Sequence, residues 1–212
     1  MPQVLVALDQ ARWLGLWSRL GAHANGLEIF EKLIAAYAEP ARVYHTAAHI
    51  QDCLTQFDWS RHLAFRPDEV EAALWFHDAV YVPGASDNEE QSAHLAQAAL
   101  ATAAVEPETA RRIGRLVLET RHLTIPRDPD TQLLCDIDLS ILGRKPAVFQ
   151  EFEDRIRREY GWVPDTTYRR SRSEVLAGFL RRRPIYQTEY FRARYEIPAR
   201  QNLQRIIAEL AD

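Results

Sequence analysis

The chain has 212 residues and a net charge of −4, with 47% hydrophobic and 26% charged residues. This balance is typical of a globular protein and excludes a largely disordered chain. The charge also argues against a general nucleic-acid-binding protein, because such a protein needs a strong positive field to bind phosphates. A small anionic substrate needs only local positive charge, so this composition remains compatible with one.

Apolar residues recur at helical spacing through most of the chain, while strand patterning is nearly absent. The predicted fold class is therefore all-α. Helices are expected, in chain order, at about 9–20, 26–38, 44–59, 67–78, 86–104, 107–122, 130–142, 146–160 and 164–182, followed by a mostly helical tail, 186–210, that breaks near Pro198. In the fifth of these, Ser86 and Glu89 have the spacing of a capping box.

A single domain over 1–212 is the simplest organisation, since one core commonly serves about 150–250 residues. No repeat, linker or low-complexity segment interrupts the chain. The oligomeric state is left open by the sequence.

Cys53 and Cys135 form no Cys-x-x-Cys pair and show no metal-ligand spacing, so we interpret both as reduced, buried residues. Asp9 and Arg12 interrupt the apolar start of the chain, so no signal peptide is expected. No apolar run approaches the roughly 20 residues of a membrane span. These observations predict a cytoplasmic protein with no membrane partner.

The first unusual segment is Tyr44–His49, where His45 and His49 are four residues apart. On a helix they would share one face, and Asp52 would lie on the same side, able to hold the second nitrogen of a metal-bound imidazole. Alone, the pattern fits equally well two histidines packed at the start of a helix.

The second segment places His77 and Asp78 at the end of an apolar helix. A buried carboxylate needs a compensating partner such as a cation, although a surface charge pair at a helix end would give the same pattern. In the third segment Asp136 and Asp138 interrupt an apolar stretch, and two residues apart on a helix they cannot point the same way. Either could instead be a surface acid.

Together the three segments supply imidazoles and carboxylates and lack the thiolates of a structural zinc site. Such a mixed nitrogen and oxygen site suits a divalent ion of Mn, Mg, Fe, Co, Ni or Zn. Four ligands leave coordination positions open for water and substrate, as a catalytic ion requires.

The order of these motifs resembles the HD-domain superfamily of metal-dependent phosphohydrolases. Tyr44-His45-x-x-x-His49-x-x-Asp52 and Asp138-Leu139-Ser140 are similar to motifs of the cyclic-nucleotide phosphodiesterases, distant members of that group. A closer resemblance, from about Tyr44 to Asn202, is to a family of small bacterial predicted HD phosphohydrolases. It rests on four segments: Tyr44–Ile50, Trp75–Tyr81, Asp87–Ser92 and Asp136–Gly143.

The resemblance implies a single-domain HD-type helical bundle, with a metal-site core at about 40–145 and C-terminal helices 146–212 packed on it. It also implies that the metal ligands are His49, His77, Asp78 and Asp138, with His45 as the acid that protonates the leaving group. His45 and His49 could exchange roles, and Asp136 competes with Asp138 for the last position. Tyr81 stands where the phosphodiesterases carry a further histidine, which puts a second metal of that kind in doubt.

Several neighbouring residues are expected to contact substrate: Tyr44, Glu89, Arg121 and His122. Glu89 has the capping-box role as an alternative, and His122 that of a histidine at a helix C-terminus. Arg42 could clamp an anion or lie at the surface.

The function implied is metal-dependent hydrolysis of a nucleotide or other small phosphate ester, through water activated by the metal and oriented by Asp78. One alternative is a di-iron oxygenase of the HD type, for which only His122, Glu89 and Asp136 could conveniently supply further ligands. Another is a non-catalytic module that binds a nucleotide.

Overall fold

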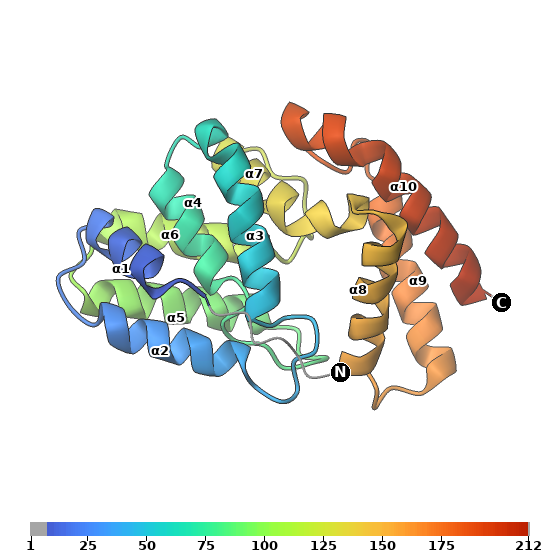
Figure 1. The fold of residues 1–212 in the computed structure, drawn as a ribbon, viewed down its shortest axis with the longest axis horizontal. Helices are drawn as coiled ribbons and strands as arrows, with labels where there is room; N and C mark the ends of the chain where they lie inside the picture. Colours follow the sequence, from blue (N-terminus) through green and yellow to red (C-terminus); the bar gives the residue numbers. More distant parts are fainter. Residues whose placement is uncertain (1–7, 212) are drawn as a thin grey trace. The chain divides into compact units, whose positions relative to one another are not determined.

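A computed structural model describes residues 8–211 of the chain, and within that range every regular element is a helix (Figure 1). The predicted all-α fold class is confirmed. The α-helices are α1 (Gln10–Arg19), α2 (Gly26–Tyr37), α3 (Ala47–Ser60), α4 (Pro67–Phe76), α5 (Asn88–Thr102), α6 (Pro107–Glu119), α7 (Pro129–Asp138), α8 (Pro146–Glu159), α9 (Asp165–Arg181) and α10 (Glu189–Ala211). Two short 3₁₀ helices are η1 (Arg61–Leu63) and η2 (Leu139–Gly143).

The chain divides into two compact units, Met1–Leu134 and Cys135–Asp212. Helix α7 begins in the first unit, and its residues 135–138 belong to the second. The single domain expected from the sequence stays a prediction. No helix within 8–211 combines the length and apolar character that crossing a bilayer requires.

An aromatic cluster forms the core of the first unit. The indole of Trp13 stacks on Trp17, with ring centroids 4.9 Å apart, and meets Trp75 and Phe76 edge-on at 5.3 and 5.7 Å. Trp75 and Phe76 are completely buried at the end of α4. Such pairs add specific geometry to the burial of large apolar surfaces. The residues immediately before His77 are thus fixed by the core.

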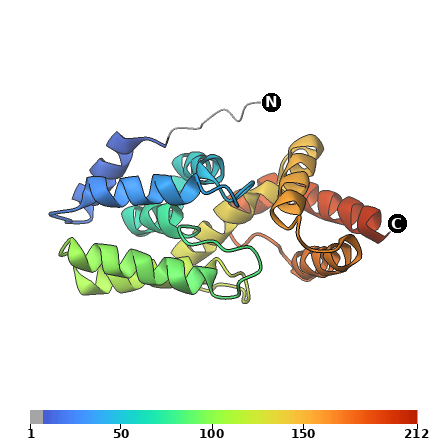
Figure 2. The ribbon, with the colours of Figure 1, turned by 90° about the horizontal axis from the view of Figure 1, so that it is seen from below.

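Helices α5 and α6 complete this unit as a pair that lies side by side (Figures 1 and 2). They run in opposite directions because a short turn at 103–106 joins them. Pro107 occupies the first turn of α6, and the Glu106 carboxylate accepts a hydrogen bond from the Thr109 amide. Both features favour a helix start at this point.

A buried carboxylate joins three segments of the same unit. Glu71, on α4, accepts hydrogen bonds from Arg12 at 2.7 Å, Arg61 at 2.6 Å and Arg19 at 3.3 Å. Its side chain is 2% exposed, whereas the three arginines reach solvent. The charge of Glu71 is therefore compensated as a buried ion requires.

In the second unit, α9 and α10 pack side by side (Figure 1) and η2 lies against α10. A Cβ at Gly143 would lie 2.5 Å from the Tyr195 Cβ, so the close approach of η2 and α10 requires glycine there. Asn202 donates hydrogen bonds to the carbonyls of Leu142 and Arg144, which fixes the same contact.

The structure corrects three local predictions. Helix α10 continues through Pro198, where a break was expected, because its buried face extends on both sides of that residue to Tyr195 and Ala199. The capping box of Ser86 and Glu89 does not form: α5 starts one residue later, with Asp87 at the N-cap position and no side-chain cap. Packing and loop contacts outweigh these local signals.

The third correction concerns His45. Helix α3 starts at Ala47, so His45 lies in the preceding turn, and the expected shared helical face with His49 is wrong. Thr46 is extended, with φ −112° and ψ 178°, which separates the two histidines. Their rings remain neighbours, with centroids 6.0 Å apart.

Candidate metal centre

His49, His77 and Asp78 converge on one point in the first unit. The Nε2 atoms of His49 and His77 are 3.0 Å apart, and the Asp78 Oδ2 lies 3.4 Å from the first and 3.1 Å from the second. His49 comes from the first turn of α3, and His77 and Asp78 follow the end of α4. Two segments 28 residues apart therefore supply three potential ligand atoms to one place.

Two side chains form hydrogen bonds with the last backbone carbonyls of α4. His77 Nδ1 lies 3.0 Å from the Leu74 carbonyl, and the Tyr37 hydroxyl donates to the Trp75 carbonyl at 2.8 Å. Carbonyls at a helix C-terminus lack partners within the helix, so such contacts fix how the chain leaves it. They orient His77 and the following Asp78.

The contact with Leu74 selects one tautomer of His77. A carbonyl accepts only from a protonated nitrogen, so Nδ1 carries the hydrogen and, in the neutral ring, Nε2 presents a lone pair. That lone pair faces the carboxylate of Asp78 at 3.1 Å. Two acceptors this close require a positive charge between them, supplied by a metal ion or by a second proton on the ring.

The electrostatics of Asp78 agree with that requirement. Burial by itself raises the pKa of Asp78, but the charges of His77 and His45 and hydrogen bonds from His49 and His77 outweigh it and hold the pKa well below its usual range. The ionised carboxylate is thus the form that this site stabilises.

The distances also fit a shared ion. Atoms each about 2.1 Å from one ion, at angles of about 90–110°, are about 3.0–3.4 Å apart. The three separations in the site span that range, from 3.0 to 3.4 Å. Two imidazoles and a carboxylate are ligands that transition metals accept. The donor set of His49, His77 and Asp78 therefore fits a divalent metal ion.

Arg42 ties the two sides of the site together. It is buried, and its guanidinium donates to the backbone carbonyls of Asp78 at 2.5 Å, Ala79 at 3.0 Å and His45 at 3.3 Å. Arg42 is therefore neither an anion clamp nor a surface residue, the two roles expected from the sequence. A guanidinium can serve several carbonyls at once because its donors form a rigid fork.

Aromatic rings surround the histidines. The ring of Tyr81 stacks on His45 with centroids 4.1 Å apart, and the Tyr44 ring lies 5.0 Å from His45 and 4.8 Å from His49. The structure thus brings His45 and Tyr44, both predicted site residues, to the candidate metal centre. Asp52 lies half-buried on α3, and its predicted role beside His49 stays a prediction.

The loop after Asp78 is fixed by two polar side chains of α5. Ser92 exchanges hydrogen bonds with the amide and carbonyl of Val80, and Asn88 does the same with Val82. This explains the Asn and Ser in the segment Asp87–Ser92, which the sequence analysis singled out without a structural reason.

The other residues predicted to contact substrate lie on α5 and after α6. Burial, together with the charges of Asp78 and Glu90, raises the pKa of Glu89. Arg121 forms an ion pair with Glu90. His122 follows the end of α6 in a left-handed conformation, with φ 55°. Substrate contact by these residues stays a prediction.

Asp136 and Asp138 lie on the part of α7 that belongs to the second unit. The Asp136 carboxylate accepts hydrogen bonds from the Gln187 amide at 2.8 Å and from the Thr188 amide and hydroxyl, both at 2.7 Å. Burial raises its pKa to about 6 against these hydrogen bonds. Asp136 therefore connects α7 to the start of α10, which argues against it as a ligand. Asp138 is the last residue of α7, and its ligation stays a prediction.

Cys53 is the residue that the sequence analysis missed. It is buried one helical turn after His49, with its Sγ 3.8 Å from both ring nitrogens of that histidine. His49, Cys53 and His77 each offer a ligand atom within 4.8 Å of the others. The four-residue spacing from His49 was visible in the sequence, but a search for pairs of cysteines passes over it.

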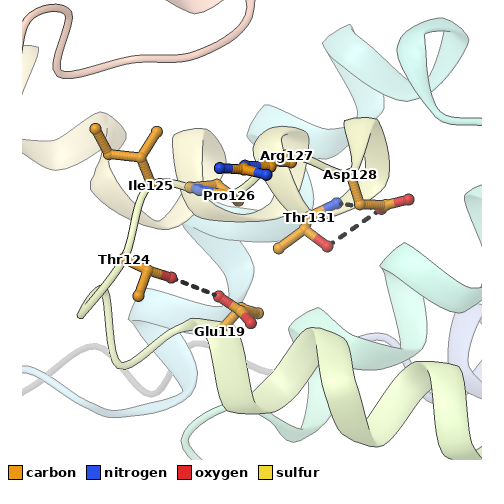
Figure 3. A pocket seen from close by; sticks show the side chains of 7 residues that line it. All are labelled: Glu119, Thr124, Ile125, Pro126, Arg127, Asp128 and Thr131. Atoms are coloured by element: carbon orange, nitrogen blue, oxygen red, sulfur yellow. Dashed lines mark hydrogen bonds between the residues drawn. The ribbon is translucent and has the colours of Figure 1, made fainter.

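A separate hollow opens on the connection between α6 and α7, lined by Glu119, Thr124, Ile125, Pro126, Arg127, Asp128 and Thr131 (Figure 3). Its polar groups contact one another: Thr124 bonds to Glu119, and Thr131 to Asp128. None of the predicted site residues lines it, and most of its walls are exposed.

Comparison of the chain with models of protein families, with curated proteins and with solved structures gives no match. Function must therefore be argued from the site itself.

Proposed function

We propose that this protein is a metal-dependent phosphohydrolase of the HD type that acts on a nucleotide or another small phosphate ester. The observation that carries the proposal is the convergence of His49 Nε2, His77 Nε2 and Asp78 Oδ2 within 3.0–3.4 Å of one another. The resemblance of the surrounding motifs to HD phosphohydrolases supplies the reaction class.

In this proposal His49, His77 and Asp78 hold a divalent ion, and Asp138 is the further ligand that the sequence pattern predicts. Such an ion supplies a lower pKa for water and positive charge for the phosphoryl oxygens. Asp78 combines two tasks, since its side chain is 16% exposed while that of His77 is 1% exposed. Its carboxylate would both hold the ion and orient a water molecule.

His45 has the role of general acid. It lies outside the group of three ligand atoms but beside it, with its ring 6.0 Å from that of His49, and it is half-buried. Stacking on Tyr81 restricts the direction of its ring. An imidazole held in this way can deliver a proton to the departing oxygen of the substrate.

The test combines metal analysis with a panel of phosphomonoesters and phosphodiesters. Protein loaded with Mn²⁺ or Zn²⁺ should hydrolyse at least one class, whereas His77→Ala and Asp78→Ala should lose both the metal and the activity. His94→Ala, an exposed histidine on α5, is the matched control and should keep both.

An Asp78→Ala protein that is active without metal would refute the proposal. Metal and nucleotide binding without turnover of any ester would favour the non-catalytic module instead.

A further inference from the structure

We propose that Cys53 is a ligand of the same ion as His49 and His77, and that the resident metal is therefore thiophilic, with Zn²⁺ as the expected occupant. The inference rests on the proposed metal site and goes beyond it, because it names an additional ligand and the class of metal. Nothing in the phosphohydrolase resemblance implies a thiolate at this position.

The first argument is the position of the sulfur. Cys53 follows His49 by one turn of α3, and side chains four residues apart on a helix lie one above the other. The Sγ is 3.8 Å from both His49 nitrogens, and it lies within 4.8 Å of a ligand atom of His77. At a tetrahedral zinc ion, with Zn–S about 2.3 Å and Zn–N about 2.05 Å, sulfur and nitrogen are about 3.5 Å apart. The 3.8 Å separation from His49 is longer than this, so the thiol side chain would rotate toward the ion on binding.

The second argument is the environment of the thiol. Cys53 is 2% exposed and His49 is 6% exposed, so solvent has little access to either side chain. A buried cysteine surrounded only by apolar groups would be an inert part of the core. This one instead lies 3.8 Å from both nitrogens of the His49 imidazole and within 4.8 Å of a ligand atom of His77.

The third argument is ligand type. Beside the imidazoles of His49 and His77 and the carboxylate of Asp78, a thiolate from Cys53 would add a soft ligand, and its proton would leave to solvent as the metal binds. Ligand type then discriminates among metals, because thiolate favours Zn²⁺ and similar ions over Mg²⁺ and Mn²⁺.

Cobalt(II) provides a direct probe, since a thiolate bound to Co²⁺ gives an intense charge-transfer absorption in the near ultraviolet. We expect this band in the wild-type protein and in Cys135→Ser, which alters the other buried cysteine. Cys53→Ser and Cys53→Ala should lose the band while the weaker visible bands of bound Co²⁺ persist. Their affinity for Zn²⁺ should fall at least tenfold, whereas their affinity for Mg²⁺ should change less.

The outcomes separate the two proposals. Co²⁺ binding by the wild type without a charge-transfer band, or a band that survives in Cys53→Ser, would overturn the role of Cys53 and leave the metal site standing. Failure of the wild type to bind Co²⁺ or Zn²⁺ at all would overturn both.

A measurement that needs no variant at Cys53 covers the case in which those variants do not fold. X-ray absorption of the zinc-loaded Cys135→Ser protein should show one sulfur at about 2.3 Å from the metal. Coordination of the zinc ion by nitrogen and oxygen atoms alone would exclude the thiolate.

Discussion

The guanidinium of Arg42 donates a hydrogen bond to the backbone carbonyl of Asp78, 2.5 Å away and 36 residues along the chain. The same side chain donates to His45 and Ala79, so one buried cation connects the turn before α3 to the residues after α4. Both of these segments carry residues of the candidate site, and the Arg42 guanidinium also pairs with the Glu39 carboxylate at 3.0 Å. We infer that Arg42 is a positioning residue.

Arg42→Lys keeps the charge but cannot reach three carbonyls with a planar fork. Metal affinity should fall about 10–100-fold, as it does when groups that orient metal ligands are changed. Metal titration of the folded protein measures this. Arg111→Lys, on the exposed face of α6, serves as the control and should bind metal normally. Unchanged affinity in Arg42→Lys would show that the ligands hold their geometry without it.

The sequence was sufficient for the fold class and for most of the helices, because apolar spacing and prolines at helix starts mark them directly. It also identified His77 and Asp78 as a pair at the end of an apolar helix. The sequence pattern could not show that His45 lies outside α3. The helix begins after Thr46 because the backbone of Thr46 is extended, and nothing in the sequence marks this threonine as extended.

The roles of Arg42 and Cys53 depend on packing between segments, which no local pattern contains. Apart from Glu39, three residues earlier, Arg42 bonds to backbone carbonyls. Every residue has a carbonyl, so the sequence carries no mark of those partners. The two acids of α7 show the same limit. Spacing predicts that Asp136 and Asp138 point apart, but only the structure shows Asp136 bound to the start of α10.

Glu71→Ala tests the ion network of the first unit. Removing this carboxylate leaves Arg12, Arg19 and Arg61 without their common partner, although Asp58 and Asp68 still pair with them. The free energy of unfolding should fall by about 2–3 kcal/mol, less than for an ion pair with no solvent access. Arg19→Ala, whose side chain is 45% exposed, should cost below about 1 kcal/mol. Urea unfolding of both variants makes the comparison, and equal effects would contradict the central role of Glu71.

Asp136→Ala and Asp138→Ala separate a structural carboxylate from a predicted ligand. Asp136→Ala leaves the Gln187 amide and the Thr188 amide and hydroxyl without their acceptor. The free energy of unfolding should therefore fall by about 2–3 kcal/mol. Metal should still bind to this variant. Asp138→Ala should weaken metal binding. Loss of metal in Asp136→Ala at a temperature where it is folded would assign the ligand to Asp136.

His45→Ala tests the acid role against a merely structural one. The ring stacks on Tyr81 but contributes no atom to the group formed by His49, His77 and Asp78, so metal affinity should stay within a few-fold of wild type. Loss of a general acid lowers turnover by about 10²–10⁴-fold, and most for esters whose leaving group is a poor one. The test therefore compares how much His45→Ala lowers turnover of an alkyl ester and of a nitrophenyl ester of the same phosphate. A deficit of equal size for both esters would mean that His45 shapes the site and delivers no proton, since a good leaving group departs without one.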